Sequence, residues 1–456
     1  MHALRAVILF CGAACATLSA AQDPYASTYR AAEDPPTLVR HATVLTGDGE
    51  RVDDGDVLIV DGKIAKIGRG LRAPSGAREI EAKGRWVTPG IIDVHSHLGV
   101  YPSPGVQGLD DGNEATSPST ANVWAEHSIW PDDPGFTAAR QGGITSLQIL
   151  PGSANLFGGR SVTLKNVAAI TYQAMKFPGA PQGLKMACGE NPKRVYGSTG
   201  KFPSTRMGNA AAMRAQWIEA TEYIRDWNDY DSKKKAGKDD AKPPKRDLRL
   251  DTLAAVLKGD ILVHNHCYRA EEMAFVLDMA REFGCRVSTF HHATEAYKVA
   301  DLLAENNVCA AMWADWWGFK IESYDAIPEN IAIVDRVKNG CAIVHSDSAE
   351  GIQHLNQEAA KVMARAKAIG WDIRPEHAIR WLTANPAKAI GIDGLTGSLA
   401  VGKMADVVVW NRNPFSSYAL VDQVLIDGVV VFDRSKPRDQ PVSDFLLGQP
   451  ANDVRL

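Results

Sequence analysis

Apolar stretches of strand length alternate with amphipathic stretches of helix length through the middle of this 456-residue chain. We expect seven β-strands in this region, over residues 91–97, 144–150, 183–188, 260–266, 286–292, 308–313 and 341–347. Amphipathic helices are expected between them, for example over residues 271–283, 296–305 and 331–338. Alternation over roughly 300 residues predicts a parallel sheet, and the (β/α)8 barrel is its usual closed form near that size. The eighth strand is expected near residues 167–175.

Short strands joined by tight turns lie on both sides of this region. Residues 37–89 contain apolar strands, two of which are separated by Asp61-Gly62. Near the other end, Asp427-Gly428 separates another pair of apolar strands. An Asp-Gly pair suits a two-residue hairpin turn, because both central residues of that turn need a positive φ. We expect the two β segments to form one small sheet domain, although two separate β patches would carry the same local pattern.

The composition argues against a nucleic-acid partner. Hydrophobic residues make up 45% of the chain and charged residues 23%, which is ordinary for a globular protein. The formal net charge of -4 gives none of the basic excess that nucleic-acid binders usually carry. The lysine-rich stretch 226–246 is interpreted as a solvated surface insertion. Residues 98–134, rich in Gly, Pro, Ser and Asp, form too long a connection to be a simple loop and are expected to be a lid over the site.

The first 21 residues have the pattern of a secretory signal peptide. Arg5 precedes the uncharged stretch 6–18, and Ser19-Ala20-Ala21 supplies the small residues that a signal peptidase needs. The apolar stretch is shorter than the roughly 20 residues that span a bilayer, and no second apolar segment is long enough to do so. We therefore expect an exported protein without a membrane span, periplasmic or secreted after cleavage near Ala20 or Ala21.

Five cysteines follow the expected signal peptide: Cys188, Cys267, Cys285, Cys309 and Cys341. An oxidising compartment would permit disulfides. However, the number is odd and no paired spacing is visible. We therefore expect buried free thiols.

Possible metal ligands lie where the predicted strands end. The first strand ends in His95 and His97, and residues i and i+2 of a strand point to the same side. Further strand-end residues with ligand chemistry are His264, His266, His291, His292 and Asp347. In a barrel, the C-terminal ends of all strands open on one face, where active sites lie. Because imidazole and carboxylate are zinc ligands, these side chains are expected to converge on a divalent metal ion.

The same segments resemble the motifs of the amidohydrolase superfamily, which comprises metal-dependent hydrolases built on a distorted barrel. Residues 88–97 resemble its first-strand motif. Within the superfamily the chain is most similar to the imidazolonepropionase-like and Xaa-Pro dipeptidase-like branch. His266-Cys267-Tyr268 resembles the fifth-strand motif of that branch, His292-Ala293-Thr294 its sixth-strand motif and Ser346-Asp347-Ser348 its eighth-strand motif. Residues 382–388, 397–398, 402–403 and 405–406 are also typical of the superfamily. The resemblance spans residues 37–436.

The resemblance implies a domain organisation. A distorted (β/α)8 TIM barrel is expected over residues 90–392. A small composite β-sandwich would combine residues 37–89 with residues 393–436. The signal peptide over residues 1–21 would precede these domains, and a C-terminal tail over residues 437–456 would follow them.

Strand parity and the resemblance together select the ligands. His264 and His266 share one face of their strand, and the resemblance selects His266. His291 and His292 are expected on opposite faces, so that only one of them can ligate, and the resemblance selects His292. His345 shares a face with Asp347 but lies two residues deeper, where core packing or hydrogen bonding is expected.

A bridging ligand is expected in the stretch 184–190. Related binuclear enzymes use a carboxylated lysine in the fourth strand, and Lys185 fits that place. Other branches use a glutamate, and Glu190 lies where the strand would reach the mouth of the site. The sequence leaves both open; if neither bridges, the site holds one metal ion. The cofactor is therefore expected to be one or two divalent ions per chain, with zinc preferred.

The expected chemistry is hydrolysis of a C–N bond in an amide, peptide or cyclic amide. A divalent ion lowers the pKa of bound water from 15.7 toward about 7. Asp347 would act as general base toward that water and then as general acid toward the leaving nitrogen. His292 or His266 would polarise the carbonyl. Two alternatives stay open: deamination or ring opening of a heterocycle, and a catalytically silent barrel that serves binding or assembly.

The substrate is expected to be a small molecule or a short peptide. Candidate substrate-binding residues are Arg160, Arg194, Tyr268 and Arg269, which are expected in loops that line the mouth of the site. Because a guanidinium binds a carboxylate in a bidentate way, these arginines suggest an acidic substrate or one with a C-terminal carboxylate. The sequence is also compatible with a homo-oligomer.

Overall fold

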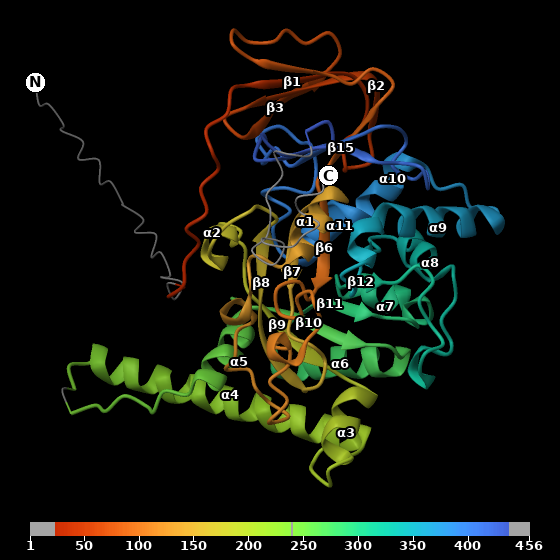
Figure 1. Ribbon diagram of the computed structural model, residues 1–456. Coiled ribbons are helices and arrows are strands. Elements are labelled where there is room, and N and C mark those ends of the chain that lie inside the picture. Colours follow the sequence, from red (N-terminus) through yellow and green to blue (C-terminus); the bar gives the residue numbers. More distant parts are fainter. Residues whose placement is uncertain (1–22, 239, 437–456) are drawn as a thin grey trace, which may run out of the picture.

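The computed structural model describes residues 23–238 and 240–436 and arranges their strands in two sheets (Figure 1). One sheet forms a nearly closed barrel, and the other belongs to a separate small domain. The predicted fold class, a distorted (β/α)8 barrel with a small β domain, is confirmed. The signal peptide expected over residues 1–21 and the tail expected over residues 437–456 lie outside the described residues.

Within the described residues, the barrel sheet has the strand order β13-β12-β11-β10-β9-β8-β7-β6. The bounds of these strands are β6 Ile91–Ser96, β7 Ile144–Ile149, β8 Phe157–Lys165, β9 Gly183–Ala187, β10 Leu262–Cys267, β11 Val287–His292, β12 Cys309–Met312 and β13 Ala342–Val344. Neighbouring strands pair in parallel, except that β8 is antiparallel to both β7 and β9. The side chains of β6, β7 and β9 are buried along their whole length, as expected for the wall of a barrel covered by helices.

The expected position of the eighth strand is wrong. The strand is β8, over Phe157–Lys165, whereas the proposed stretch 167–175 contains the short helix α2 over Tyr172–Met175. Gly158, Gly159 and Arg160 interrupt the apolar pattern of β8, so the sequence of this strand does not have the continuous apolar character expected of a barrel strand. The reversed direction of β8 also departs from the strict alternation on which the prediction rested.

Helices cover the barrel from outside. Their bounds are α1 Pro134–Gln141, α3 Glu190–Gly197, α4 Arg206–Lys235, α5 Leu248–Lys258, α6 Ala270–Phe283, α7 Ala300–Glu305, α8 Asn330–Arg336, α9 Leu355–Ala368, α10 Pro375–Ala378 and α11 Ala384–Ala389. Single 3-10 turns lie at η1 Gln107–Leu109, η2 Ala125–Ser128, η3 Ala296–Lys298, η4 Ile321–Ser323, η5 Gly351–His354 and η6 Ile379–Leu382. In α6 the residues Met273, Val276, Leu277 and Ala280 are buried, which is the spacing of one helix face.

The lysine-rich stretch 226–246 is exposed to solvent over most of its length, as expected. Its first part is the end of α4, a 30-residue helix that projects from the barrel (Figure 1). The expected helix over 296–305 is divided into η3 and α7.

Strands from both ends of the described chain share the small sheet. The N-terminal segment contributes β1 Thr37–Leu45, β2 Arg51–Val60, β3 Lys63–Gly68, β4 Arg78–Glu81 and β5 Trp86–Pro89, and the C-terminal segment contributes β14 Val407–Trp410, β15 Val421–Ile426 and β16 Val429–Asp433. The two groups join where β5 pairs antiparallel with β14. Asp61-Gly62 and Asp427-Gly428 form the expected hairpin turns, and all four residues have positive φ.

The described residues contain two disulfide bonds, so the expectation of free thiols is wrong for four of the five cysteines. Cys188 is bonded to Cys267 and Cys309 to Cys341, whereas Cys285 is free. The register between neighbouring strands brings these cysteines together. Ala187 of β9 pairs with His266 of β10, and Ala310 of β12 pairs with Ala342 of β13, so the cysteines beside them become direct neighbours. The sequence separations of 79 and 32 residues give no sign of this pairing.

No helix in the described ranges is both long enough and apolar enough to span a bilayer.

A buried cluster of charged side chains links the barrel to the small sheet. Lys165, at the end of β8, places its Nζ 2.7 Å from Asp427 Oδ2 and 3.3 Å from Asp406 Oδ1. The Tyr29 hydroxyl donates a hydrogen bond of 2.7 Å to Asp427 Oδ2. Burial, followed by the negative charge of Asp406, raises the pKa of Asp427 above its ordinary value. The positive charge of Lys165 therefore balances two buried carboxylates.

We predict that Lys165→Met destabilises the protein by about 3–5 kcal/mol, because it leaves two carboxylates without their buried cation. Denaturant unfolding followed by circular dichroism measures the change. The matched control is Lys66→Met, at an exposed lysine of β3, which should change the free energy of unfolding by less than about 0.5 kcal/mol. Equal effects of the two substitutions would show that the cluster does not stabilise the fold.

Candidate metal centre

Imidazole side chains gather at the C-terminal end of the barrel strands. They come from β6, β10, β11 and the segment after β13, and those that are buried are His95, His264, His266, His291, His292 and His345. Burial lowers the pKa of each of them below the ordinary value, because a charged ring would lose its hydration there. The cluster is therefore a set of neutral imidazoles, which is the form that binds metal ions.

His95, His292 and Asp347 form a compact donor group, with one ligand atom from each lying within 4.8 Å of the others. Asp347 Oδ1 is 3.4 Å from His95 Nε2 and 3.2 Å from His97 Nε2, and Asp347 Oδ2 is 3.9 Å from His292 Nδ1. Burial acts to raise the pKa of Asp347, but the hydrogen bond to His97 and nearby positive charge outweigh it and lower that pKa. Nitrogen donors around an ionised carboxylate fit a divalent ion such as zinc.

Two buried ring nitrogens support the same interpretation. Within the described part of the chain, His266 Nδ1 and His345 Nδ1 have no hydrogen-bond partner. The other nitrogen of His266 has only a long contact of 3.4 Å with Asn191 Nδ2. Buried polar atoms normally find a partner, so two unpartnered ring nitrogens in this cluster indicate a place for a cation.

His291 and His292 do not lie on opposite faces of the strand as expected, whereas the expectation that only one of them ligates stays a prediction. Both rings lie close to His95, with ring centroids 4.7 and 4.8 Å away. His292 has a φ of 71°, and Ala293 and Asp347 also adopt positive φ. This left-handed backbone breaks the alternation of the strand and turns His292 toward the cluster. Such strained residues concentrate at functional sites.

A second group, deeper in the barrel, consists of His95, His291 and His345, and one ligand atom from each also lies within 4.8 Å of the others. However, both ring nitrogens of His291 already face other imidazoles: Nδ1 lies 2.9 Å from His95 Nδ1, and Nε2 lies 3.0 Å from His264 Nδ1. His345 Nε2 contacts His292 Nδ1 at 3.2 Å. The group with Asp347 contains a carboxylate and lines the cavity, so of the two groups it is better suited to hold an ion.

The structure separates the two candidates for a bridging ligand. Lys185 is fully buried on β9, and its Nζ lies 3.4 Å from His95 Nε2. Burial lowers the pKa of Lys185 to about 8. Glu190 is the first residue of α3, and its Oε1 lies 3.9 Å from Lys320 Nζ at the mouth of the site. Lys185 thus reaches the imidazole cluster, whereas the Glu190 carboxylate is directed toward a lysine.

A cavity of about 530 Å³ opens in front of the donor group. Its walls include donor residues, cations, amides and aromatic rings: His95, His97, Tyr101, Asn113, Gly152, Ser153, Glu190, Asn191, Arg194, His266, Tyr268, His292, Trp313, Trp316, Phe319, Lys320 and Asp347. Of the long connection 98–134, only Tyr101 and Asn113 belong to this wall. The volume suits a ligand of dipeptide size.

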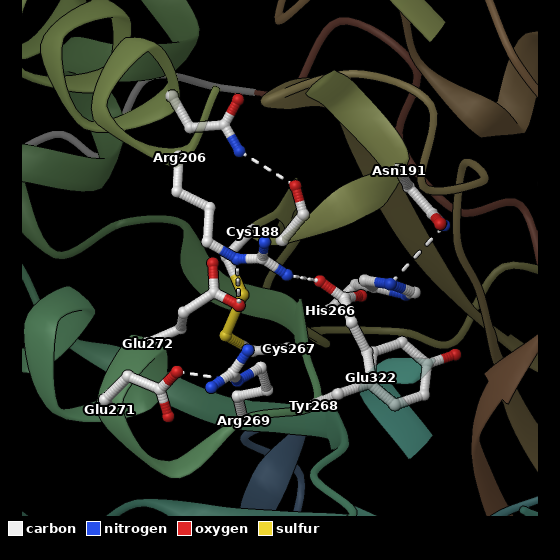
Figure 2. Close-up of a disulfide and its surroundings, with 12 residues drawn as sticks. Cys188, Asn191, Arg206, His266, Cys267, Tyr268, Arg269, Glu271, Glu272 and Glu322 are labelled. Atoms are coloured by element: carbon white, nitrogen blue, oxygen red, sulfur yellow. Dashed lines mark hydrogen bonds and ion pairs between the residues drawn. A yellow bond between two sulfur atoms is a disulfide. The ribbon is translucent and has the colours of Figure 1, made fainter. Parts of the chain in front are cut away.

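The substrate-binding candidates divide into two pairs. Arg194 and Tyr268 line the cavity, as expected, and Tyr268 stacks on His292 with ring centroids 5.1 Å apart. Arg160 and Arg269 do not line it, so their expected location is wrong. Arg160 is a strand residue of the reversed β8 and hydrogen-bonds Thr252 and Gln182 outside the cavity. Arg269 precedes α6 and forms an ion pair of 2.6 Å with Glu271 (Figure 2).

The loop after β12 supplies cavity residues that the sequence reasoning missed. Trp313, Trp316, Phe319 and Lys320 all come from this short segment. Their signal in the sequence is a run of aromatic residues that ends in a lysine directly after a predicted strand. Trp313 stacks on His292 with centroids 4.3 Å apart, so the loop covers one side of the donor group.

Figure 2 shows how the ends of β9 and β10 are held together beside the site. The Cys188–Cys267 disulfide joins them, and the backbone N–H of Cys188 donates a 2.9 Å hydrogen bond to the carbonyl of His266. Glu322 accepts a 2.6 Å hydrogen bond from the backbone N–H of Glu190 and pairs with Arg206. The disulfide and Glu322 therefore connect His266, the start of α3 and the aromatic loop.

The sequence is similar to those of known proteins. A sequence profile described as the Amidohydrolase family matches residues 86–431. Amidohydrolase tasK of Hapsidospora irregularis is 32% identical over 449 residues, which cover 90% of this chain and 45% of that protein. A dihydroorotase of Geobacter metallireducens is 32% identical over 108 residues, which cover 24% of this chain and 20% of the enzyme. The chain thus spans less than half the length of these curated relatives.

Solved structures show the same fold. An amidohydrolase from Thermotoga maritima MSB8 superposes with a TM-score of 0.78 at 34% identity, covering 87% of this chain and 100% of that chain. An adenosine deaminase from Xanthomonas campestris with bound zinc superposes with a TM-score of 0.51 at 17% identity, covering 90% of this chain and 96% of that chain. The second likeness concerns the fold alone.

We predict that the double substitution of Cys188 and Cys267 by alanine lowers the free energy of unfolding by about 2–5 kcal/mol, because the bond closes a long loop of chain. Guanidinium unfolding under non-reducing conditions measures the change. Cys285→Ala, at the free and partly exposed thiol, is the matched control and should alter stability much less. An unchanged unfolding midpoint in the double variant would mean that the disulfide does not brace these strand ends.

Proposed function

The chain belongs to the amidohydrolase family, and we propose that it hydrolyses a C–N bond of an amide, peptide or cyclic amide with metal-activated water. One observation carries the proposal: the Asp347 carboxylate lies within 3.4 Å of the Nε2 atoms of both His95 and His97 and lines the cavity. A carboxylate in this place can hold an ion and also face a substrate.

The residues that would hold the metal ions are His95, His97, His266, His292 and Asp347. Lys185 would supply the bridging ligand after its neutral amine takes up dissolved CO2 and loses a proton to form a carbamate. A bound divalent ion, which we take to be zinc, would supply a water of lowered pKa at neutral pH. The contact of 3.4 Å between Lys185 Nζ and His95 Nε2 favours Lys185 over Glu190 as the bridge. The unpartnered Nδ1 of His266 supports a place for that residue in the donor set.

The protein groups have separate roles in the proposed reaction. Asp347 takes the proton from the attacking water and passes it to the leaving nitrogen, acting as base and then as acid. His266 or His292, both in the cavity wall, orients and polarises the carbonyl. Tyr268 and Trp313 stack on His292 and fix the plane of its ring.

The chain is proposed to act outside the cytoplasm, after removal of residues 1–21. The charge pattern of the N-terminal sequence supports this location, and so do the two disulfides, because disulfides persist mainly in oxidising compartments.

We predict that Asp347→Asn lowers kcat by about 10²–10⁴-fold, because the amide cannot accept the proton. Release of amine and carboxylate from an amide panel measures turnover, circular dichroism checks the fold, and an ammonia assay would identify deamination instead. Glu190→Gln, a neutral substitution of another carboxylate in the same cavity wall, is the matched control and should keep turnover within about tenfold of wild type. Full activity of Asp347→Asn would exclude the assigned role.

We predict that Lys185→Met reduces the metal content from two equivalents to at most one, because the bridging group is lost. Inductively coupled plasma mass spectrometry of the purified variants measures the ratio. Glu190→Gln again serves as the control and should retain two equivalents. If Glu190→Gln loses an equivalent while Lys185→Met retains both, the bridge is Glu190 and the assignment is wrong.

A further inference from the structure

Two positively charged side chains face the cavity beside the donor group. Arg194 lies on α3, and Lys320 lies in the loop before η4. Among the described residues, the guanidinium of Arg194 has neither a hydrogen bond nor an ion pair. Both side chains line the same cavity. Burial, and to a smaller extent the positive charge of Arg194, lowers the pKa of Lys320.

Lys320 lies between an aromatic ring, an amide and two carboxylates with which it forms only long ion pairs. Its Nζ lies 4.0 Å from the centre of the Tyr268 ring and donates a 3.1 Å hydrogen bond to Asn191 Oδ1. The nearest carboxylate oxygens, from Glu190 and Glu322, are 3.9 and 3.7 Å away. Both distances exceed that of a charge-assisted hydrogen bond. The ammonium therefore keeps hydrogen-bonding capacity for an anion that enters the cavity.

An apolar wall lies next to these cations. Trp316 and Phe319 are 49% and 55% exposed, although both are large apolar side chains. Each packs against Trp313, with ring centroids 5.2 and 5.9 Å away. Exposed aromatic rings in the wall of a binding cavity are suited to cover an apolar part of a ligand. The cavity thus presents two cations, an aromatic surface and the donor group together.

We propose that Arg194 and Lys320 form a carboxylate subsite, so that the substrate is an N-acyl amino acid or a dipeptide with a free carboxylate and an apolar side chain. The proposed function supplies the place of the scissile bond, at Asp347, and the inference rests on it to that extent. The carboxylate accepts hydrogen bonds from the guanidinium and the ammonium, and the apolar side chain lies against Trp316 and Phe319.

The first test measures binding without turnover. N-methylsulfonyl-L-phenylalanine has no hydrolysable acyl bond, and N-methylsulfonyl-L-phenylalaninol differs from it in lacking the carboxylate. Calorimetry with the purified full chain should show the acid binding at least tenfold more tightly than the alcohol. Equal binding of the two probes, or binding of neither, overturns the subsite. Stronger competition by inorganic phosphate than by the acid overturns its assignment to carboxylates.

Variants then assign the preference to the two cations. Arg194→Met and Lys320→Met should each reduce the preference for the acid by about tenfold and leave binding of the alcohol unchanged. Lys320→Arg, which keeps the charge, should retain most of the preference and shows that the loop is folded. Lys193→Met, next to Arg194 on α3 but outside the cavity wall, should keep the preference. Retention of the full preference in both methionine variants of the subsite overturns the proposal.

Turnover separates this inference from the proposed function. Wild-type enzyme should hydrolyse N-acetyl-L-phenylalanine, and Lys320→Met should raise KM for it more than it lowers kcat. If no amide is hydrolysed but the acid is still preferred in calorimetry, the proposed function fails and the subsite stands. If amides are hydrolysed with no dependence on a carboxylate, the subsite fails and the proposed function stands.

Discussion

The site depends on hydrogen bonds that close the barrel between its first strand, β6, and the segment after its last strand, β13. The backbone N–H of Asp347 donates a 3.0 Å hydrogen bond to the carbonyl of His95. The backbone N–H and the hydroxyl of Ser346 both donate to the carboxylate of Asp93. These contacts bring the two ends of the sheet together although more than 200 residues of chain separate them. Without this closure, the carboxylate of Asp347 would not lie beside the imidazoles of β6.

The same closure explains why so many histidines can be buried together. A buried imidazolium would be costly, and the low pKa values of these rings keep them neutral. Neutral rings can pair with one another through their nitrogens, as His291 does with His95 and His264. The contact with His291 holds the His95 ring at its Nδ1, so that Nε2 is directed toward Asp347. Covalent and ionic links on the outside, through Cys188–Cys267 and Glu322, fix the opposite wall of the cavity.

The donor residues at strand ends can be predicted from the sequence, whereas most residues that surround them cannot. Asp347 was identified because a carboxylate after an apolar strand must lie at the open face of a barrel. Arg160 was misplaced because β8 runs in the opposite direction, which periodicity does not reveal. The bond between Cys188 and Cys267 depends on a register between strands 79 residues apart. Lys320 lies in a loop whose path is set by contacts with Tyr268 and Asn191, and no local pattern encodes them.

Crystallography at the zinc absorption edge would show whether the donor group around Asp347 holds a metal ion. Crystals of the purified chain, grown without chelators, would be measured on both sides of the edge. We expect anomalous density between the side chains of His95, His97 and Asp347, with a second peak next to Lys185. Absence of anomalous density after soaking with zinc, manganese or iron, each measured at its own edge, would show that these residues do not hold a metal ion. A peak only in the deeper group of His95, His291 and His345 would contradict the assigned ligands.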